Sequence, residues 1–138
     1  MAHVLFVCHQ NAGRSQMSQA LFARAAGGRH SAASAGTTPA EHVHPSVISV
    51  MREVGIDLGG RTPQALTLPL AEAADVVVSM GCGDACPVIP GRRLLDWDLP
   101  DPSGRPIAEV RATREDIRRL VGQLLVELDG EHEGGAAR

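Results

Sequence analysis

The sequence has no lysine and no tyrosine, and only two phenylalanines and one tryptophan among its 138 residues. All 13 basic residues are arginines and the formal net charge is −3, so the chain lacks the basic surface typical of nucleic-acid-binding proteins. With so few aromatic side chains, the core must be built from Val, Leu, Ile and Ala. The length fits one compact domain and is too short for two well-packed cores.

Long apolar runs are also missing. Residues 4–8 are apolar but far too few to span a membrane, and no basic segment precedes a longer apolar stretch. We therefore expect a cytoplasmic protein. Three cysteines are an odd count for structural disulfides in a reducing compartment, which makes metal binding or redox chemistry the better explanation for them.

Short apolar runs alternate with stretches of helical period, which predicts crossover units, a parallel sheet and the α/β class. Strands are predicted at 3–7, 30–35, 75–79 and 92–95, and helices from Ser15 to the Gly27-Gly28 pair, over 44–54, and from a capping box formed by Thr113 and Asp116. Residues 1–129 are predicted to form the single domain. Residues 130–138 carry no apolar anchor and are predicted to be a disordered tail.

The loop between the first strand and the first helix has the composition of an oxyanion-binding site. Cys8 ends the strand, and the loop residues are His9, Gln10, Asn11, Ala12, Gly13, Arg14 and Ser15. A strand-to-helix loop directs free backbone N–H groups and the positive end of the helix at one point. Small residues let the backbone wrap closely, and an arginine can hold two oxygens at once. The same field would stabilise a Cys8 thiolate, to which Ser15 can donate a hydrogen bond. The alternative is a buried core cysteine beside a solvated arginine.

The stretch "CHQNAGRSQM" resembles the low-molecular-weight protein tyrosine phosphatase family, and most closely its arsenate reductase branch. The segments "SAGT" at 34–37, "HPSVISVMREVGIDL" at 44–58, "GCGDACP" at 81–87 and "DWDLPDP" at 96–102 follow in the family's order. The resemblance implies a four-stranded parallel sheet flanked by helices. It also implies that Cys8 is the nucleophile, residues 9–14 form the oxyanion cradle, and Asp101 is the general acid.

Two more cysteines, Cys82 and Cys86, distinguish an arsenate reductase from a phosphatase within this family. Reduction of As(V) to As(III) takes two electrons, so a second thiol must attack a Cys8–arsenate adduct and leave a disulfide. We expect Cys82 to make this attack and Cys86 to move the disulfide to a Cys82–Cys86 pair. No bound cofactor or metal is expected. An external thiol reductant is required, either thioredoxin, which a third cysteine favours, or a small thiol such as mycothiol.

Two other functions stay open at this point. A phosphotyrosine or small-ester phosphatase would use Cys8, Arg14 and Asp101 without Cys82 or Cys86. A zinc- or arsenic-binding sensor module would use the cysteines without turnover. Some members of the resembled family hold potassium with a glutamate in the first helix, and Gln19 stands at that position. Potassium activation is therefore not expected.

Overall fold

The computed structural model describes residues 1–81 and 90–136, with side chains described up to residue 130. Within these residues one sheet is formed by β1 (His3–Cys8), β2 (Ser31–Gly36), β3 (Val76–Met80) and β4 (Arg93–Asp96). The strands lie in the order β2-β1-β3-β4 and pair in parallel throughout. The predicted α/β class with a four-stranded parallel sheet is confirmed.

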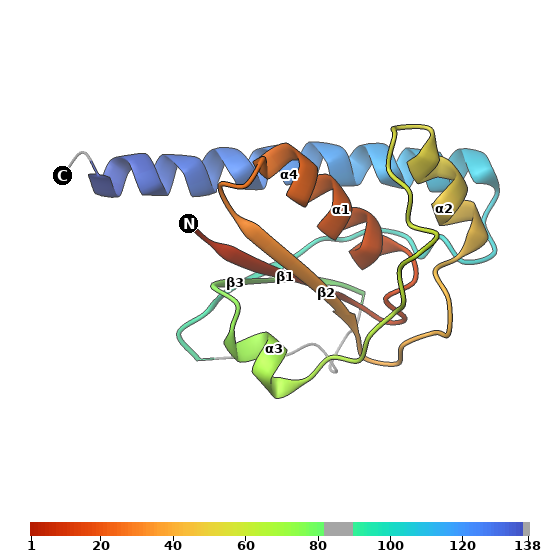
Figure 1. Cartoon of the computed structure of the whole chain (residues 1–138), viewed down its shortest axis with the longest axis horizontal. Helices are drawn as coiled ribbons and strands as arrows, with labels where there is room; N and C mark the ends of the chain where they lie inside the picture. The colour runs from red at the N-terminus through yellow and green to blue at the C-terminus, as the bar shows by residue number, and fades with distance from the viewer. Residues whose placement is uncertain (82–89, 137–138) are drawn as a thin grey trace.

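The helices cover both faces of the sheet, as a parallel sheet requires. They are α1 (Arg14–Ala26), α2 (Pro45–Arg52), α3 (Leu68–Glu72) and α4 (Ile107–Ala136). Figure 1 shows α1, α2 and α4 on one side of the sheet and the short α3 on the other. Side chains alternate along β1 accordingly: Phe6 belongs to the larger core cluster beneath α1 and α4, while Leu5 belongs to the smaller one with Ala71 of α3.

The few aromatic side chains gather in the larger core cluster. The ring of Phe6 lies 5.6 Å from that of Phe22 on α1 and 5.7 Å from that of Trp97, measured between centroids. Trp97 follows β4 directly and is 8% exposed. It packs the start of the segment that leads to Asp101 against the middle of the sheet.

The last helix differs from its prediction at both ends. It begins at Ile107, six residues before Thr113, and the Thr113 hydroxyl donates to the Glu109 carbonyl one turn earlier in the same helix, at 3.1 Å. Thr113 therefore occupies an interior position, and the predicted capping box with Asp116 is wrong. A threonine hydroxyl can bond backward to a carbonyl within a helix as readily as it can cap one, which is why the pattern misled.

At its other end α4 continues to Ala136, so residues 130–136 are helical where the sequence predicted a disordered tail. Asp129 anchors the helix just before this stretch, because its carboxylate accepts from Arg29 at 3.0 Å and from His30 at 2.8 Å. Beyond an anchored turn, each further residue adds a backbone hydrogen bond without the cost of nucleation. None of the helices in the described part of the chain has both the length and the hydropathy needed to cross a membrane.

The helix α3 has no counterpart among the predicted elements. It has five residues, too few for a periodic apolar pattern to show. The local signals were present, since the hydroxyl of Thr67 accepts from the backbone N–H of Leu70 at 3.4 Å and Pro69 occupies the first turn. Such a cap is recognised as a helix start when several apolar residues with helical spacing follow it. In α3 only the side chain of Ala71 is buried, so this pattern is missing.

An ion-pair cluster holds the end of α2 against α4. The carboxylate of Glu53 accepts two hydrogen bonds from Arg111, at 2.9 and 2.7 Å, and one from Arg114 at 2.7 Å. Arg114 is 8% exposed and also donates to the Val50 carbonyl. The hydrogen bonds from Arg111 and then from Arg114 lower the pKa of Glu53 from 4.5 to about 2.

This cluster predicts a pH-dependent stability. Because the pKa of Glu53 is lower in the folded chain than in the unfolded one, its stabilising effect is complete above about pH 4.5 and is lost as the pH falls toward about 2. Glu53→Gln should therefore have a lower melting temperature than the parent protein at pH 7, and the difference should shrink below pH 4.5. Thermal unfolding followed by circular dichroism from pH 7 to pH 3 measures it.

Glu41→Gln is the matched control, since the Glu41 side chain is exposed and forms no ion pair within the described residues. It should leave the melting temperature unchanged throughout. If Glu53→Gln lowered the melting temperature by the same amount at pH 7 and pH 3, ionisation of Glu53 would not be what stabilises the fold.

Candidate functional site

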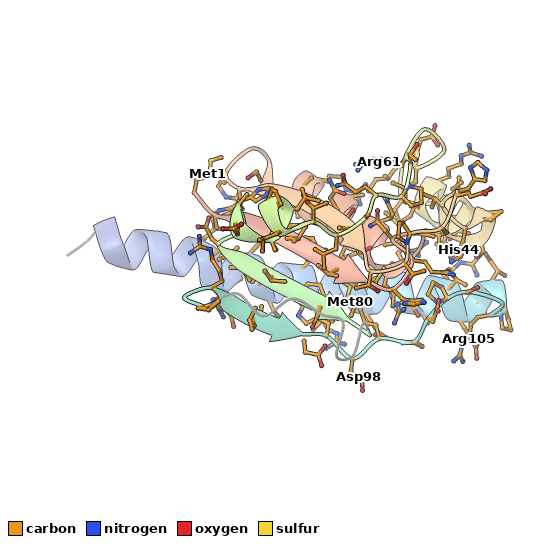
Figure 2. The ribbon with its side chains drawn as sticks, turned by 90° about the horizontal axis from the view of Figure 1, so that it is seen from below. Met1, His44, Arg61, Met80, Asp98 and Arg105 are labelled. Carbon is orange, nitrogen blue, oxygen red and sulfur yellow. The ribbon has the colours of Figure 1, made fainter. Side chains whose placement is uncertain are left out.

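The candidate site lies where β1 passes into α1. Cys8 is the last residue of β1 and is 2% exposed, and α1 begins at Arg14. Figure 2 shows Met1 near the amino ends of the strands, and His44 and Arg105 beyond their carboxyl ends. Gly13 precedes α1 and has no side chain to cap it, so the first backbone N–H groups of the helix remain available to a ligand.

The segment that follows β2 orients the backbone of this loop. Its N–H groups donate to the outward-facing carbonyls of the loop at 2.8–3.2 Å; the pairs are Thr37 to Cys8, Thr38 to His9, Ala40 to Gln10, and His44 to Ala12. In a trans peptide the carbonyl points away from the N–H of the next residue. The N–H groups of residues 9, 10, 11 and 13 therefore face away from that segment. We call residues 8–15 the anion loop.

Asn11 is the conformational pivot of the anion loop. It is fully buried and has a φ of 51°, in the left-handed region that asparagine tolerates better than most residues. Its backbone N–H donates to the Cys8 sulfur at 3.3 Å, and its side-chain Nδ2 donates to the Ser15 hydroxyl at 2.7 Å. Asn11 thereby contacts both the Cys8 sulfur and the Ser15 hydroxyl, and it holds these two groups next to each other.

The Ser15 oxygen lies 2.8 Å from the Cys8 sulfur, which places the predicted serine in contact with the thiol. The sulfur thus has two hydrogen-bonding neighbours, the Ser15 hydroxyl and the Asn11 N–H, and both side chains are buried. Both groups can donate a hydrogen bond to the sulfur when it acts as a nucleophile. Of the other predicted loop residues, His9 is exposed and Gln10 is partly buried.

Arg14 is buried under the segment that carries Asp101. Its side chain is 8% exposed, its Nη1 donates to the Leu99 carbonyl at 3.2 Å, and its Nη2 lies 3.8 Å from Asp101 Oδ2. Gly81 lies against the guanidinium with a φ of +77°, and a Cβ at that position would overlap it. The guanidinium is therefore held in one place before any anion arrives, which favours recognition of a tetrahedral anion by two donors.

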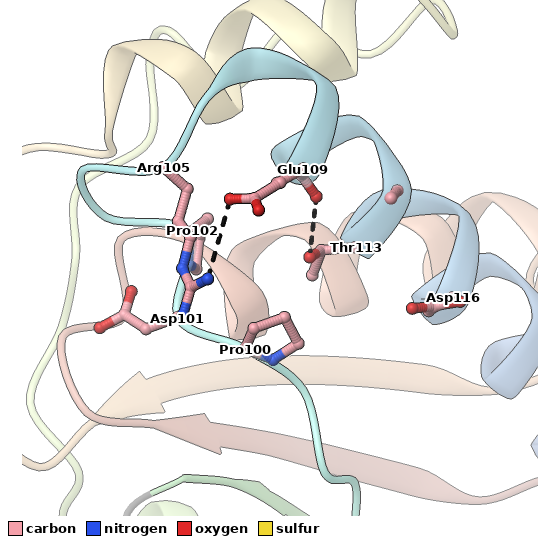
Figure 3. A pocket seen from close by; sticks show the side chains of 8 residues that line it. Pro100, Asp101, Pro102, Arg105, Glu109, Thr113 and Asp116 are labelled. Carbon is pink, nitrogen blue, oxygen red and sulfur yellow. Dashed lines mark hydrogen bonds and ion pairs between the residues drawn. The ribbon is translucent and has the colours of Figure 1, made fainter.

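Asp101 is exposed, and its Oδ1 accepts from the backbone N–H of Ser103 at 3.0 Å. A cavity of about 170 Å³, lined by residues of the 100–105 segment and of α4, lies behind it. Figure 3 shows the Asp101 carboxylate pointing away from Glu109 and Asp116 across this cavity. The 100–105 segment and α4 therefore leave a space between them, which the Arg105–Glu109 ion pair spans at 3.7 Å.

On the other side, Pro102 packs closely on Gly13. A Cβ placed on Gly13 would lie 2.7 Å from Pro102 Cγ, which is closer than real side chains approach. The absence of a side chain at position 13 thus lets the segment carrying Asp101 lie directly over the anion loop. This contact and the Arg14 pair set the position of Asp101.

The structure places Ser15 against Cys8 and Asp101 near Arg14, and the catalytic roles of these four residues stay predictions. Cys82 and Cys86 lie outside the described residues. Within residues 1–81 and 90–130, no group of three or more His, Cys, Asp or Glu side chains could hold a metal ion.

Three residues contribute to the site although the sequence pattern did not predict that they would. Gln16 and Gln64 both donate to Asn11 Oδ1, at 3.1 and 3.0 Å, and the Leu99 carbonyl receives Arg14. Gln16 stands among the polar residues Arg14, Ser15 and Ser18 at the start of α1, so its residue type does not single it out. Gln64 and Leu99 act through backbone atoms, which residue type does not reveal.

The parallel sheet, with a cysteine and an arginine at opposite ends of a strand-to-helix loop, defines a phosphatase-like α/β protein. The chain belongs to the low molecular weight phosphotyrosine protein phosphatase family, whose sequence profile matches residues 3–133. The family predicted from the sequence is confirmed.

Individual relatives agree with this assignment. A Halobacterium salinarum protein provisionally named an arsenate reductase is 41% identical over 129 residues, covering 90% of this chain and 91% of its own. The structure of a thioredoxin-dependent arsenate reductase from Corynebacterium glutamicum is 36% identical with a TM-score of 0.84, covering 95% of this chain. This chain spans 63% of the length of that one. An arginine phosphatase from Geobacillus stearothermophilus also has a TM-score of 0.84, at 25% identity and with 97% of each chain covered.

Proposed function

We propose that this chain reduces arsenate to arsenite. The observation that carries the proposal is the buried Cys8 sulfur, 2.8 Å from the Ser15 hydroxyl, at the base of a loop whose arginine is already fixed by Leu99. The similarity to arsenate reductases over most of the chain supports arsenate as the substrate.

The first step would form a covalent adduct. Arsenate would lie in the anion loop on backbone N–H groups and on the Arg14 guanidinium, and the Cys8 thiolate would attack arsenic. One arsenic–oxygen bond breaks as the sulfur–arsenic bond forms. Asp101 would supply the proton with which that oxygen leaves as water.

The second step would transfer two electrons. The thiolate of Cys82 attacks the Cys8 sulfur of the adduct, the sulfur–arsenic bond breaks, and its electron pair leaves with arsenic as arsenite. Cys86 then attacks the Cys82 sulfur of the Cys8–Cys82 disulfide, which frees Cys8 and leaves a Cys82–Cys86 disulfide.

An external thiol reductant must reduce that last disulfide to complete the cycle. The thioredoxin dependence of the Corynebacterium relative supports thioredoxin as this partner. A small thiol such as mycothiol is the alternative. Turnover with purified thioredoxin, thioredoxin reductase and NADPH, compared with turnover in the small thiol alone, distinguishes the two.

A phosphatase is the second candidate function, favoured by the similarity to an arginine phosphatase. It would use the same anion loop, Arg14 and Asp101 to transfer a phosphoryl group to Cys8 and then to water. It would not need Cys82 or Cys86, so the two functions differ in what happens to the thiols.

A thiol count separates the candidate functions. After one equivalent of arsenate without reductant, the protein is denatured and its free thiols are titrated with a chromogenic disulfide reagent. We expect two of the three thiols to be lost, because one disulfide stores the two electrons given to arsenic. Phosphate in place of arsenate is the control and should cost none. Retention of all three thiols after arsenate would exclude the relay and leave a phosphatase or a binding protein.

A further inference from the structure

We infer that Gln16 is a positioning residue that, together with the backbone N–H of Gln64, holds the direction of the hydrogen bond between Ser15 and Cys8. The inference rests on the proposed role of Cys8 as nucleophile and extends it to a residue that touches neither the sulfur nor the anion. It acts through a chain of three contacts, from Gln16 to Asn11, from Asn11 to Ser15, and from Ser15 to Cys8.

The first link fixes the amide of Asn11. The backbone N–H of Gln64 can only donate, so the Asn11 atom 3.0 Å from it must be the oxygen. Gln16 Nε2 donates to that same oxygen at 3.1 Å. With two donors on Oδ1, the other end of the amide is the NH₂ group, and it faces Ser15.

The second link fixes the proton of Ser15. The hydroxyl oxygen receives Asn11 Nδ2 at 2.7 Å, and a hydroxyl has only one proton of its own. The neighbour left to take that proton is the Cys8 sulfur, at 2.8 Å. If the Asn11 amide turned over, the serine proton would go to its oxygen, and the sulfur would lose its donor.

The side chain of Gln16 is poorly explained by stability alone. It is 2% exposed, and its Oε1 is the buried side-chain oxygen that finds no hydrogen-bond partner in the described part of the molecule. Burying an unpaired amide oxygen disfavours folding. An apolar side chain of the same length would avoid that cost, so what Gln16 offers is its Nε2 hydrogen bond to Asn11.

The charged groups near the anion loop come from different elements. Arg14 projects from α1, Asp101 from the segment after β4, and His9 lies exposed on the loop itself. None of them bonds to Asn11 or to Gln16 among the described contacts. Within the described residues, His44, which precedes α2, is the other titratable group beside the loop, and replacing Gln16 removes no described contact of any of the four.

The test measures the reactivity of Cys8 without arsenate. In a background of Cys82→Ser and Cys86→Ser, Cys8 is the remaining cysteine, and its alkylation by iodoacetamide is followed from pH 4 to pH 9. Gln16→Met keeps the length of the side chain and removes its donor. We expect the pH midpoint of alkylation to rise, but by less than the roughly one unit that complete loss of a hydrogen bond to a charged group would give, because Gln64 still donates to Asn11 Oδ1. The melting temperature should stay the same or rise.

Gln19→Met is the matched control. Gln19 lies one turn further along α1, and its Oε1 accepts from Ser34 at 2.6 Å without touching Asn11. It should leave the alkylation midpoint unchanged. Gln16→Leu repeats the test with a branched side chain in case the methionine variant does not fold.

An unchanged midpoint in both Gln16 variants would overturn the inference and leave Gln16 with a structural role only. An equal rise in Gln19→Met would overturn it too. Because alkylation needs neither arsenate nor a second thiol, failure of the reductase proposal would appear in the thiol count and not here.

Discussion

Cys8→Ser should lower arsenate reduction and aryl-phosphate hydrolysis together, to the level of a reaction without protein. A serine hydroxyl is a far weaker nucleophile than a thiolate and cannot enter a disulfide. The oxygen would also lie in a site shaped for sulfur, between the Ser15 hydroxyl and the Asn11 N–H. Arsenate-dependent consumption of NADPH through thioredoxin and release of p-nitrophenol from its phosphate ester measure the two reactions.

Cys82→Ser and Cys86→Ser are the informative partners of that variant. Each should lose steady-state arsenate reduction and keep slow hydrolysis of the aryl ester, because ester cleavage needs the anion loop and no second thiol. The retained hydrolysis is also the control for folding. If Cys82→Ser reduced arsenate at the rate of the parent protein with the same reductant, the disulfide relay would be wrong.

Asp101→Asn should slow arsenate reduction by roughly 10²- to 10⁴-fold, the usual contribution of a general acid. The amide keeps the size of the side chain and can still accept the backbone N–H of Ser103, which contacts Oδ1 at 3.0 Å. It cannot give a proton to the departing oxygen. Hydrolysis of an ester whose leaving group needs no proton should be spared, so comparing good and poor leaving groups measures the acid role directly.

A second variant tests whether the position of Asp101 matters as well as its proton. Gly13→Ala places a methyl group 2.7 Å from Pro102 and should push the segment carrying Asp101 away from the anion loop. Its effect should resemble a mild Asp101→Asn. Gly60→Ala is the control, because a Cβ there meets open space.

Unchanged kinetics in Asp101→Asn on arsenate and on a poor leaving group would remove Asp101 from the mechanism.

Much of the fold could be read from the sequence because its signals are local. The buried runs at β1 and β3 and the apolar stripe of α4 need no knowledge of their partners to be recognised. The predictions failed where a local signal had two meanings. Thr113 donates to a carbonyl within α4 instead of capping the helix. The residues after Asp129 extend a helix that Arg29 and His30, which lie between α1 and β2, anchor from about 100 residues away.

The site divides in the same way. The sequence by itself determined that Cys8, the small loop residues, Arg14 and Ser15 share one strand-to-helix turn, since the geometry of such a turn is fixed by a few neighbouring residues. It also predicted Asp101 as the general acid through its family motif, and the Asp101 carboxylate lies 3.8 Å from Arg14. The roles of Cys82 and Cys86 remain predictions from chemistry.

Only the tertiary structure decided how the loop is held. The N–H groups of residues 37–44 orient the loop carbonyls, Gln64 fixes Asn11 from 53 residues away, and the Leu99 carbonyl fixes Arg14 from 85 residues away. These contacts use backbone atoms that every residue type except proline possesses, so no pattern of side chains predicts them. They form when the parallel sheet brings the carboxyl ends of its strands to one edge. The sequence could therefore indicate the reacting groups but not the distant residues that orient them.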